Sequence, residues 1–332
     1  MIKSSRIEYL DNLRFVSIFS VIILHVFATD YDVLDINSYD WYVLCIGDSL
    51  VKWCVPVLVM ISGALFLQPE KNIEIRDIFH KYIPRLFRAY LFWWVVYGVI
   101  NVLYKCIIQS LSFDIAFFAP WGHLWFLPML MGLYLILPFL KQIVLNHIFL
   151  LYFLVLWAVF LTISYIPYLS CIVDTMKLNF VVGYSGYFVL GYYLSKRRFP
   201  KNQACFIYIF GCLGGAICVL GNIYMSHLRG CADTFFLSYL SPHVVLMSVG
   251  IFVLFSRINI FGKITVYRNK LTPYLFGVYL THYLWLFIIN IPVIRYGLNV
   301  AFTLPIIVLL TFILSLLTVK MLYLTPLKKI VE

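Results

Sequence analysis

Arg14 and His25 are two ionisable residues in one apolar run, "LRFVSIFSVIILH". Eleven residues make three helical turns plus about 20° of rotation, so a helix places both side chains on one face, roughly 16 Å apart along its axis. Asp11 lies three residues before Arg14 and falls on the same stripe. Because imidazole accepts protons near neutral pH and guanidinium binds anions, this face could combine general-base chemistry with anion binding.

A structural interpretation of the same three residues also fits the sequence. Asp11 and Arg14 could pair at a membrane interface, and His25 could hydrogen-bond a neighbouring helix. Ionisable residues inside an apolar span usually face a cavity or a partner and mark a functional site. The shared face therefore favours a site over three unrelated structural contacts.

Arg85 and Arg88 form a second basic pair, in "YIPRLFRAY". Two residues three apart share a helix face, and two guanidinium groups there could bind phosphate groups in bidentate fashion. The pair could equally be basic residues that flank a span on the cytoplasmic side.

Three aromatic or histidine positions are weaker candidates for a binding site. His123 and Trp125 begin an expected span on the outer side, where they could contact a sugar or belong to an interfacial aromatic belt. His282 lies about ten residues into a late span and could hydrogen-bond near the reacting groups or pack between helices. These residues are possible parts of a binding site.

Three polar residues are the remaining candidates for a functional site. Ser62, beside Gly63, could line a polar site or permit close helix packing. Asp233 and His243 flank an outer loop and could contact an acceptor substrate. The eight cysteines form no CxxC pair and no metal spacing, so we expect no metal site. A disulfide among Cys45, Cys171 and Cys231 is compatible with the sequence.

These residues must be positioned by membrane helices. Of the 332 residues, 63% are hydrophobic and only 12% are charged, far from the composition of a soluble domain. Charge-poor windows of 18 or more residues recur along the chain, and each can cross a bilayer as a helix. Nothing near the N-terminus resembles a cleaved signal. We therefore expect an all-α polytopic membrane protein, with residues 1–332 as a single transmembrane domain and no soluble domain.

The sequence predicts about ten transmembrane helices. Their expected ranges are 10–29, 43–68, 82–108, 123–140, 146–168, 179–195, 204–225, 241–257, 273–292 and 301–323.

The distribution of basic residues predicts the orientation. Of the 25 Lys and Arg residues, twenty fall at one side of the expected spans, four at the other, and Lys52 lies within a span. The positive-inside rule then places both termini in the cytoplasm. The net charge of +11 follows from this bias and does not indicate nucleic-acid binding.

Several segments together resemble the acyltransferase-3 family of integral membrane proteins. The first, "YLDNLRFVSIFSVIILHVF", carries arginine and histidine separated by ten residues. The others are "VPVLVMISGALF", where Leu58 and Val59 replace the usual aromatics, and then "YIPRLFRAY", "GHLWFLPMLMGLYLILP", "GYSGYFVLGYYLSK" and "TPYLFGVYLTHYLWL". The ordered set spans nearly the whole chain and is similar to short members that O-acetylate bacterial surface polysaccharides such as enterobacterial common antigen.

The resemblance implies a membrane O-acyltransferase of the bacterial inner membrane. Acetyl-CoA would serve as co-substrate, with no permanently bound cofactor, and the acceptor would be a glycan or glycolipid hydroxyl. His25 would act as the base with Arg14 and Asp11 beside it, while Arg85, Arg88 and Arg14 would bind the acyl-CoA. The possible acceptor or thioester site would include His123, Trp125, His282, Ser62 and Asp233. Membrane lipids are the remaining expected partners.

Two functions from other classes compete with this expectation. A transporter or flippase would also place ionisable residues on a helix face, although the sequence shows no inverted repeat. A non-catalytic scaffold would scatter its polar residues instead of aligning them. The acceptor, the acyl chain, the oligomeric state and a covalent acyl-enzyme are all undecided by the sequence.

Overall fold

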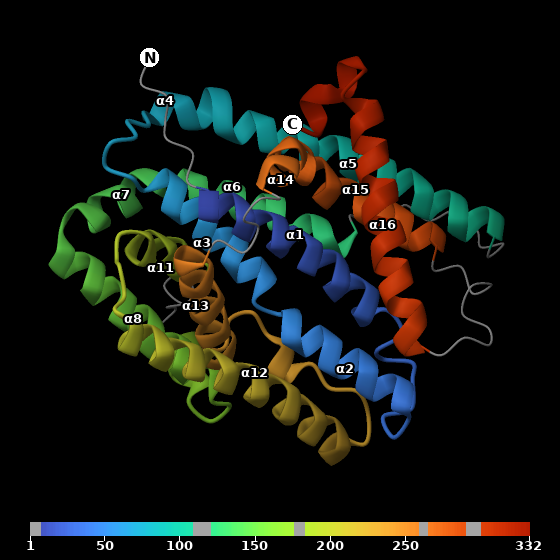
Figure 1. The fold of residues 1–332 in the computed structure, drawn as a ribbon, viewed down its shortest axis with the longest axis horizontal. Coiled ribbons are helices and arrows are strands. Elements are labelled where there is room, and N and C mark those ends of the chain that lie inside the picture. Colours follow the sequence, from blue (N-terminus) through green and yellow to red (C-terminus); the bar gives the residue numbers. More distant parts are fainter. Residues whose placement is uncertain (1–7, 109–120, 176–182, 259–264, 290–299) are drawn as a thin grey trace.

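The computed structural model describes residues 8–108, 121–175, 183–258, 265–289 and 300–332, and these residues form helices and connecting turns without a strand. The expected all-α membrane fold is confirmed. In Figure 1 the helices α1 (Glu8–Ala28), α2 (Tyr39–Val51), α5 (Ile83–Leu103) and α12 (Lys201–Arg229) run in similar directions, while α16 (Val300–Leu322) crosses them steeply.

The other long helices are α3 (Cys54–Phe66), α6 (Phe126–Leu135), α7 (Leu137–Leu145), α8 (His147–Tyr165), α11 (Ser185–Ser195), α13 (Pro242–Arg257) and α15 (Leu275–Ile289). Short helices and turns lie between them: α4 (Ile75–Asp77), η1 (Ile78–Tyr82), η2 (Tyr104–Ile108), η4 (Gly122–Trp125), α9 (Ser170–Thr175), η5 (Phe235–Leu237), α14 (Thr265–Leu271), η7 (Thr272–Tyr274) and η9 (Pro326–Ile330).

Eight helical segments of the described chain are long and apolar enough to cross a membrane, or nine if the bent segment 122–145 is one span. The expected number was about ten. The remaining expected span, 179–195, begins at residues that lie outside the described ranges, and α11 is its described part. The helices therefore agree with the sequence-based ranges to within a few residues at most boundaries.

Two expected spans are interrupted, and a proline accounts for each interruption. Residues 39–66 form α2 and α3, which are separated by a turn at Lys52 and Trp53. Pro56 cannot donate to the carbonyl of Lys52, and its ring crowds that carbonyl. Pro138 acts in the same way at the start of α7, which bends away from the segment 122–135 by 57°. The first of these breaks places Lys52 near the middle of a membrane span.

Helix α1 packs against α2, α3, α13, α15 and α16, so its polar stripe lies among protein helices. Helices α3 and α11 approach each other through two glycines. A Cβ atom on Gly63 would lie 1.7 Å from the carbonyl oxygen of Phe188, and one on Gly191 would lie 2.0 Å from that of Met60. Small residues at such contacts let helix backbones pack closely in a membrane.

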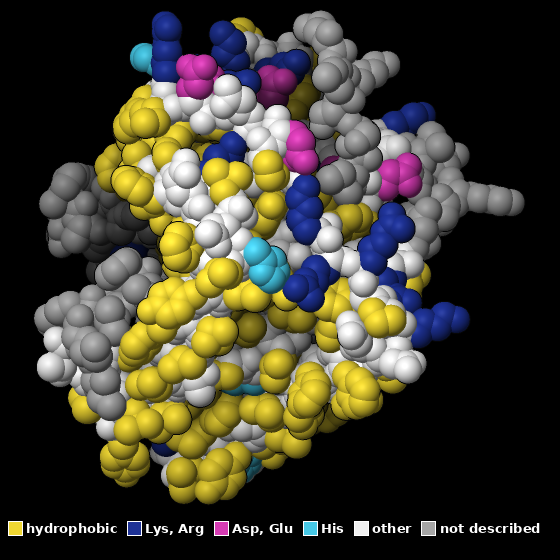
Figure 2. Space-filling view, turned by 90° about the vertical axis from the view of Figure 1, so that its left-hand side faces the viewer, with side chains coloured by type: hydrophobic (Ala, Val, Ile, Leu, Met, Phe, Trp, Pro, Cys, Tyr) yellow, Lys and Arg dark blue, Asp and Glu magenta, His cyan; other side chains and the backbone are white. Residues whose placement is uncertain are grey.

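Figure 2 shows the side of the molecule on which α4 and α7 lie in Figure 1. Lys and Arg side chains gather on the upper and right-hand parts of this face, with acidic side chains among them, and hydrophobic side chains cover the lower part. A charged end above an apolar flank is what a bundle of membrane-crossing helices presents to headgroups and lipid chains.

Candidate active site

Asp11 bridges two guanidinium groups at the start of α1. Its Oδ1 lies 3.3 Å from Nη1 of Arg14, and its Oδ2 lies 3.4 Å from Nη1 of Arg268. Arg268, on α14, is only 2% exposed, and its importance was not predicted from the sequence. The Asp11 carboxylate therefore connects α14 to α1 and orients Arg14 on the face that it shares with His25.

His25, His123 and His282 come together from three separate parts of the chain. The ring centroids of His25 and His282 are 5.2 Å apart, those of His123 and His282 are 5.3 Å apart, and those of His25 and His123 are 6.3 Å apart. We call these three residues the histidine cluster. The sequence presented them as one strong and two weak candidates and did not predict that they meet.

Hydrogen bonds to the backbone orient this cluster. Nδ1 of His282 lies 2.6 Å from the carbonyl oxygen of Tyr279, so Nδ1 carries the proton and Nε2 is left as an acceptor. The Tyr279 hydroxyl donates to the carbonyl of His123. Among the described residues, Nε2 of His282 has no hydrogen-bond partner, although the residue is buried. Buried polar atoms are normally paired, so this nitrogen is available to a polar ligand.

Aromatic side chains form the wall around the cluster. Tyr283 stacks on His123 with ring centroids 4.9 Å apart and contacts His25 at 5.2 Å. Tyr97 lies 5.0 Å from His123, stacks on Trp121 and donates its hydroxyl to the carbonyl of Leu280. Tyr283 was not predicted as a site residue, although its position directly after the intramembrane His282 could have indicated it.

A cavity of about 740 Å³ adjoins the cluster. Its lining includes Arg14, Arg85, Ser62 and Tyr279. The ring of Tyr279 lies 5.8 Å from that of His282. The Ser62 hydroxyl donates to the carbonyl of Leu58 one turn earlier, and it faces the cavity while the adjacent Gly63 makes the close helix contact. The cavity therefore extends from the guanidinium groups to Tyr279, which separates it from the histidine cluster.

The two arginines of "YIPRLFRAY" have different surroundings. Arg85 lines the cavity, and its Nε donates to the carbonyl of Glu332 at 2.7 Å. Arg88 does not line it, and its Nε donates to the carbonyl of Pro84 on its own helix at 3.2 Å. A cavity-facing guanidinium can bind an entering anion, so the structure distinguishes Arg85 from Arg88.

Trp125 belongs to an aromatic group next to the cluster. Its ring lies 6.0 Å from Tyr239, nearly parallel to it, and 5.4 Å from Tyr184. Trp125 is 38% exposed, whereas His123 in the same turn is buried. We call Trp125, Tyr184 and Tyr239 the aromatic shelf.

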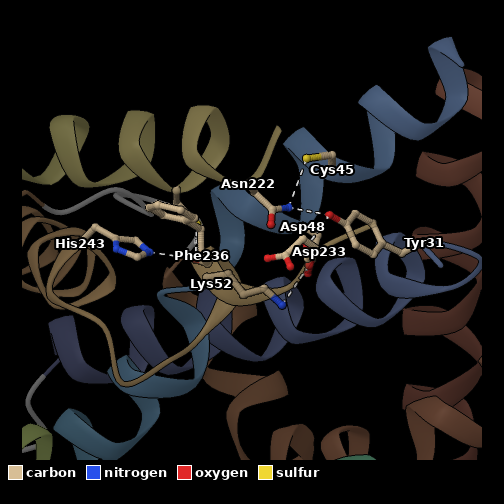
Figure 3. A network of polar contacts seen from close by, with 9 residues as sticks. Tyr31, Cys45, Asp48, Lys52, Asn222, Asp233, Phe236 and His243 are labelled. Carbon is tan, nitrogen blue, oxygen red and sulfur yellow. Dashed lines mark hydrogen bonds and ion pairs between the residues drawn. The ribbon is translucent and has the colours of Figure 1, made fainter. Parts of the chain in front are cut away.

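Asp233 and His243 lie in a separate polar network (Figure 3). The Asp233 carboxylate pairs with Arg229 at 2.5 Å, and its carbonyl accepts a hydrogen bond from the Tyr31 hydroxyl at 2.9 Å. His243 Nε2 lies 2.8 Å from the carbonyl oxygen of Phe236. These contacts hold the segment 231–241 against α12, α13 and the turn between α1 and α2, so Asp233 anchors a loop apart from the histidine cluster.

The eight cysteines are all unpaired, and the disulfide considered for Cys45, Cys171 and Cys231 is not formed. Cys45 is buried and contacts Asn222 Nδ2 at 3.3 Å. Within the described ranges, no group of three His, Cys, Asp or Glu residues is arranged to hold a metal ion.

Comparison with known proteins gives one match. The family model Acyl_transf_3, described as an acyltransferase domain, matches residues 7–320. No curated protein and no solved structure matches the chain.

Proposed function

The chain belongs to the acyltransferase-3 family of membrane acyltransferases, and on this premise we propose that it transfers acetyl from cytoplasmic acetyl-CoA to a sugar hydroxyl of a cell-surface polysaccharide or its lipid-linked precursor. The observation that carries the proposal is the cavity that Arg14 and Arg85 line and that reaches Tyr279, whose ring lies 5.8 Å from that of His282. Membership of this family favours an acyltransferase over the transporter and scaffold alternatives.

The cavity suits a long donor with a charged head and a reactive tip. Arg85 and Arg14 would bind the phosphates of the coenzyme, because a guanidinium fork matches phosphate oxygens. The pantetheine arm would then follow the lining past Ser62 to Tyr279, and the thioester would lie beside His25 and His282. The axial distance of roughly 16 Å between Arg14 and His25 is compatible with this placement.

His25 would act as the general base. A lone pair on its ring takes the proton of the acceptor hydroxyl while the hydroxyl oxygen attacks the carbonyl carbon of the thioester. The carbon–sulfur bond then breaks, the acyl group remains on the acceptor oxygen, and the leaving thiolate takes the proton from the imidazolium. His282, with its proton on Nδ1, is close enough to hydrogen-bond the same groups through Nε2.

The experiment is acetyl transfer by the purified protein in lipid nanodiscs. Radiolabelled acetyl-CoA is added with and without alkali-deacetylated envelope polysaccharide, and CoA release and labelled polysaccharide are measured. Binding of acetyl-CoA and label in the polysaccharide support the proposal. A protein that neither binds nor cleaves acetyl-CoA contradicts it.

A further inference from the structure

A buried ion pair occupies the break in the span 39–66. Nζ of Lys52 lies 2.9 Å from Oδ2 of Asp48, and the two side chains are 9% and 2% exposed. Charged side chains near the middle of a membrane span are costly and usually mark a site. Figure 3 shows the Lys52 ammonium directed to Asp48, beside the segment that carries Asp233 and Phe236.

One oxygen of this pair has no partner. Oδ1 of Asp48 makes no hydrogen bond to any described residue, although the side chain is almost fully buried. Buried carboxylate oxygens are normally satisfied, so an orphaned one beside an ammonium group needs a physical reason. A ligand that supplies the missing donor is such a reason.

The pair lies next to the aromatic shelf. The Lys52 ammonium lies 5.6 Å from the ring centroid of Tyr239, whose ring is nearly parallel to that of Trp125. Lys52 is also within electrostatic range of His25. The Tyr187 hydroxyl donates to the Tyr239 carbonyl at 2.6 Å and so holds the backbone that carries this ring. A ligand on the shelf would therefore lie beside the pair, and the pair is within electrostatic range of the expected base.

We propose that Asp48, Lys52 and the aromatic shelf form the acceptor subsite, and that this subsite binds the pyranose ring of an uncharged sugar. The inference rests on the proposed function and names its acceptor class. A sugar hydroxyl both donates and accepts, so it can donate to Oδ1 of Asp48 and accept from Nζ of Lys52. The apolar face of the ring covers Trp125 and Tyr239.

The charge balance of the pair selects the class of sugar. Asp48 neutralises Lys52, so the site offers one donor and one acceptor without a net charge. An anionic group would bring a second negative charge beside Asp48 in a region of low dielectric constant. A neutral, hydroxyl-rich ring fits this arrangement better than a uronic acid or a phosphate.

The test uses the full-length protein in nanodiscs with acetyl-CoA and methyl β-D-glucopyranoside as the acceptor probe. The key variant is Asp48→Leu with Lys52→Met, which removes both charges together and leaves no unpaired one. The control is Lys196→Met, whose ammonium pairs with Glu70 on the surface. Acetyl-CoA affinity and CoA release without sugar report the donor side, and the sugar concentration giving half-maximal CoA release reports the acceptor side.

For the wild type, we expect sugar to raise CoA release. The double variant should need at least about tenfold more sugar for half-maximal CoA release, which is the effect expected for the loss of a hydrogen bond to a charged group. Its affinity for acetyl-CoA should be unchanged. Equal sugar dependence in the wild type and the double variant overturns the inference, as does loss of donor affinity in parallel with sugar affinity. A wild type that cleaves acetyl-CoA without response to sugar also overturns it, whereas one that does not bind acetyl-CoA overturns the proposed function itself.

Discussion

The imidazole rings of His25 and His282 lie 5.2 Å apart between centroids and are tilted by 33°. They come from α1 and α15, which pack side by side. The Nδ1 proton of His282 is held by the carbonyl of Tyr279, whereas His25 also contacts Tyr283 and lies on the same face as Arg14. Two histidines at one place mean that substitution of each must be compared with substitution of the other.

Arg85 and Arg88 should contribute unequally to acetyl-CoA binding. Arg85→Ala should weaken binding by about 10-fold to 100-fold, because a charge-assisted hydrogen bond contributes on the order of 1.5–3 kcal/mol. Arg88→Ala is the matched control and should change the affinity by less than about threefold, since Arg88 does not line the cavity. Lysine at position 85 should restore the affinity only in part. Titration of acetyl-CoA into each purified variant measures this, and equal losses in both alanine variants would contradict the assignment.

The close approach of α3 and α11 should make Gly191 intolerant of any side chain. Gly191→Ala would place a Cβ 2.0 Å from a backbone oxygen, so the helices must separate, and we expect a loss of about 1–3 kcal/mol in the free energy of unfolding. Gly132→Ala is the control, because no atom lies within 4 Å of its added Cβ, and it should be neutral or stabilising by up to about 1 kcal/mol. Thermal unfolding in detergent compares them. A Gly191→Ala protein as stable as the wild type would show that the helices are not packed this closely.

The charge bias predicts the orientation of the loops. Cys231 is exposed between α12 and α13 and should react with a membrane-impermeant maleimide added outside intact cells. A cysteine introduced at Arg198, which is exposed between α11 and α12, should react only after the membrane is opened. Each is tested in a variant with no other exposed cysteine. Labelling of position 198 in intact cells would reverse the orientation and the proposed side of donor entry.

Transfer by the wild type should fall as the pH is lowered into the acidic range. A protonated imidazole has no lone pair with which to accept the hydroxyl proton, so the base is lost. The pH profile of the maximal rate measures this at saturating acetyl-CoA. A rate that rises on acidification would argue for a different proton acceptor.

The sequence was sufficient to predict the helical membrane fold, because long apolar windows indicate membrane-crossing helices. It also predicted the face that Arg14 and His25 share, which helical spacing decides. It could not predict that His123 and His282 join His25, since that depends on how η4 and α15 pack against α1. Helical spacing also treats Arg85 and Arg88 alike, and only the rotation of α5 shows which one lines the cavity.

Lys52 was visible as a lysine within a span, and Asp48 lies one turn earlier. Residues four apart are neighbours on a helix, so the pairing is compatible with the sequence, whereas the helix break beside the pair follows from Pro56. The orphaned oxygen of Asp48 is a property of the packed structure and has no signature in the sequence.

The most direct test of the account is acetyl transfer by the His25→Ala protein, compared with His25→Gln and His282→Ala. Radiolabelled acetyl-CoA measures both donor binding and transfer to the deacetylated polysaccharide. We expect His25→Ala to bind acetyl-CoA normally and to lose transfer by about 10²–10⁴-fold, with no rescue by glutamine, because an amide cannot accept the proton. His282→Ala should retain more activity than His25→Ala. Near-normal turnover by a well-folded His25→Ala protein, together with an inactive His282→Ala protein, would contradict the account and assign the base to α15.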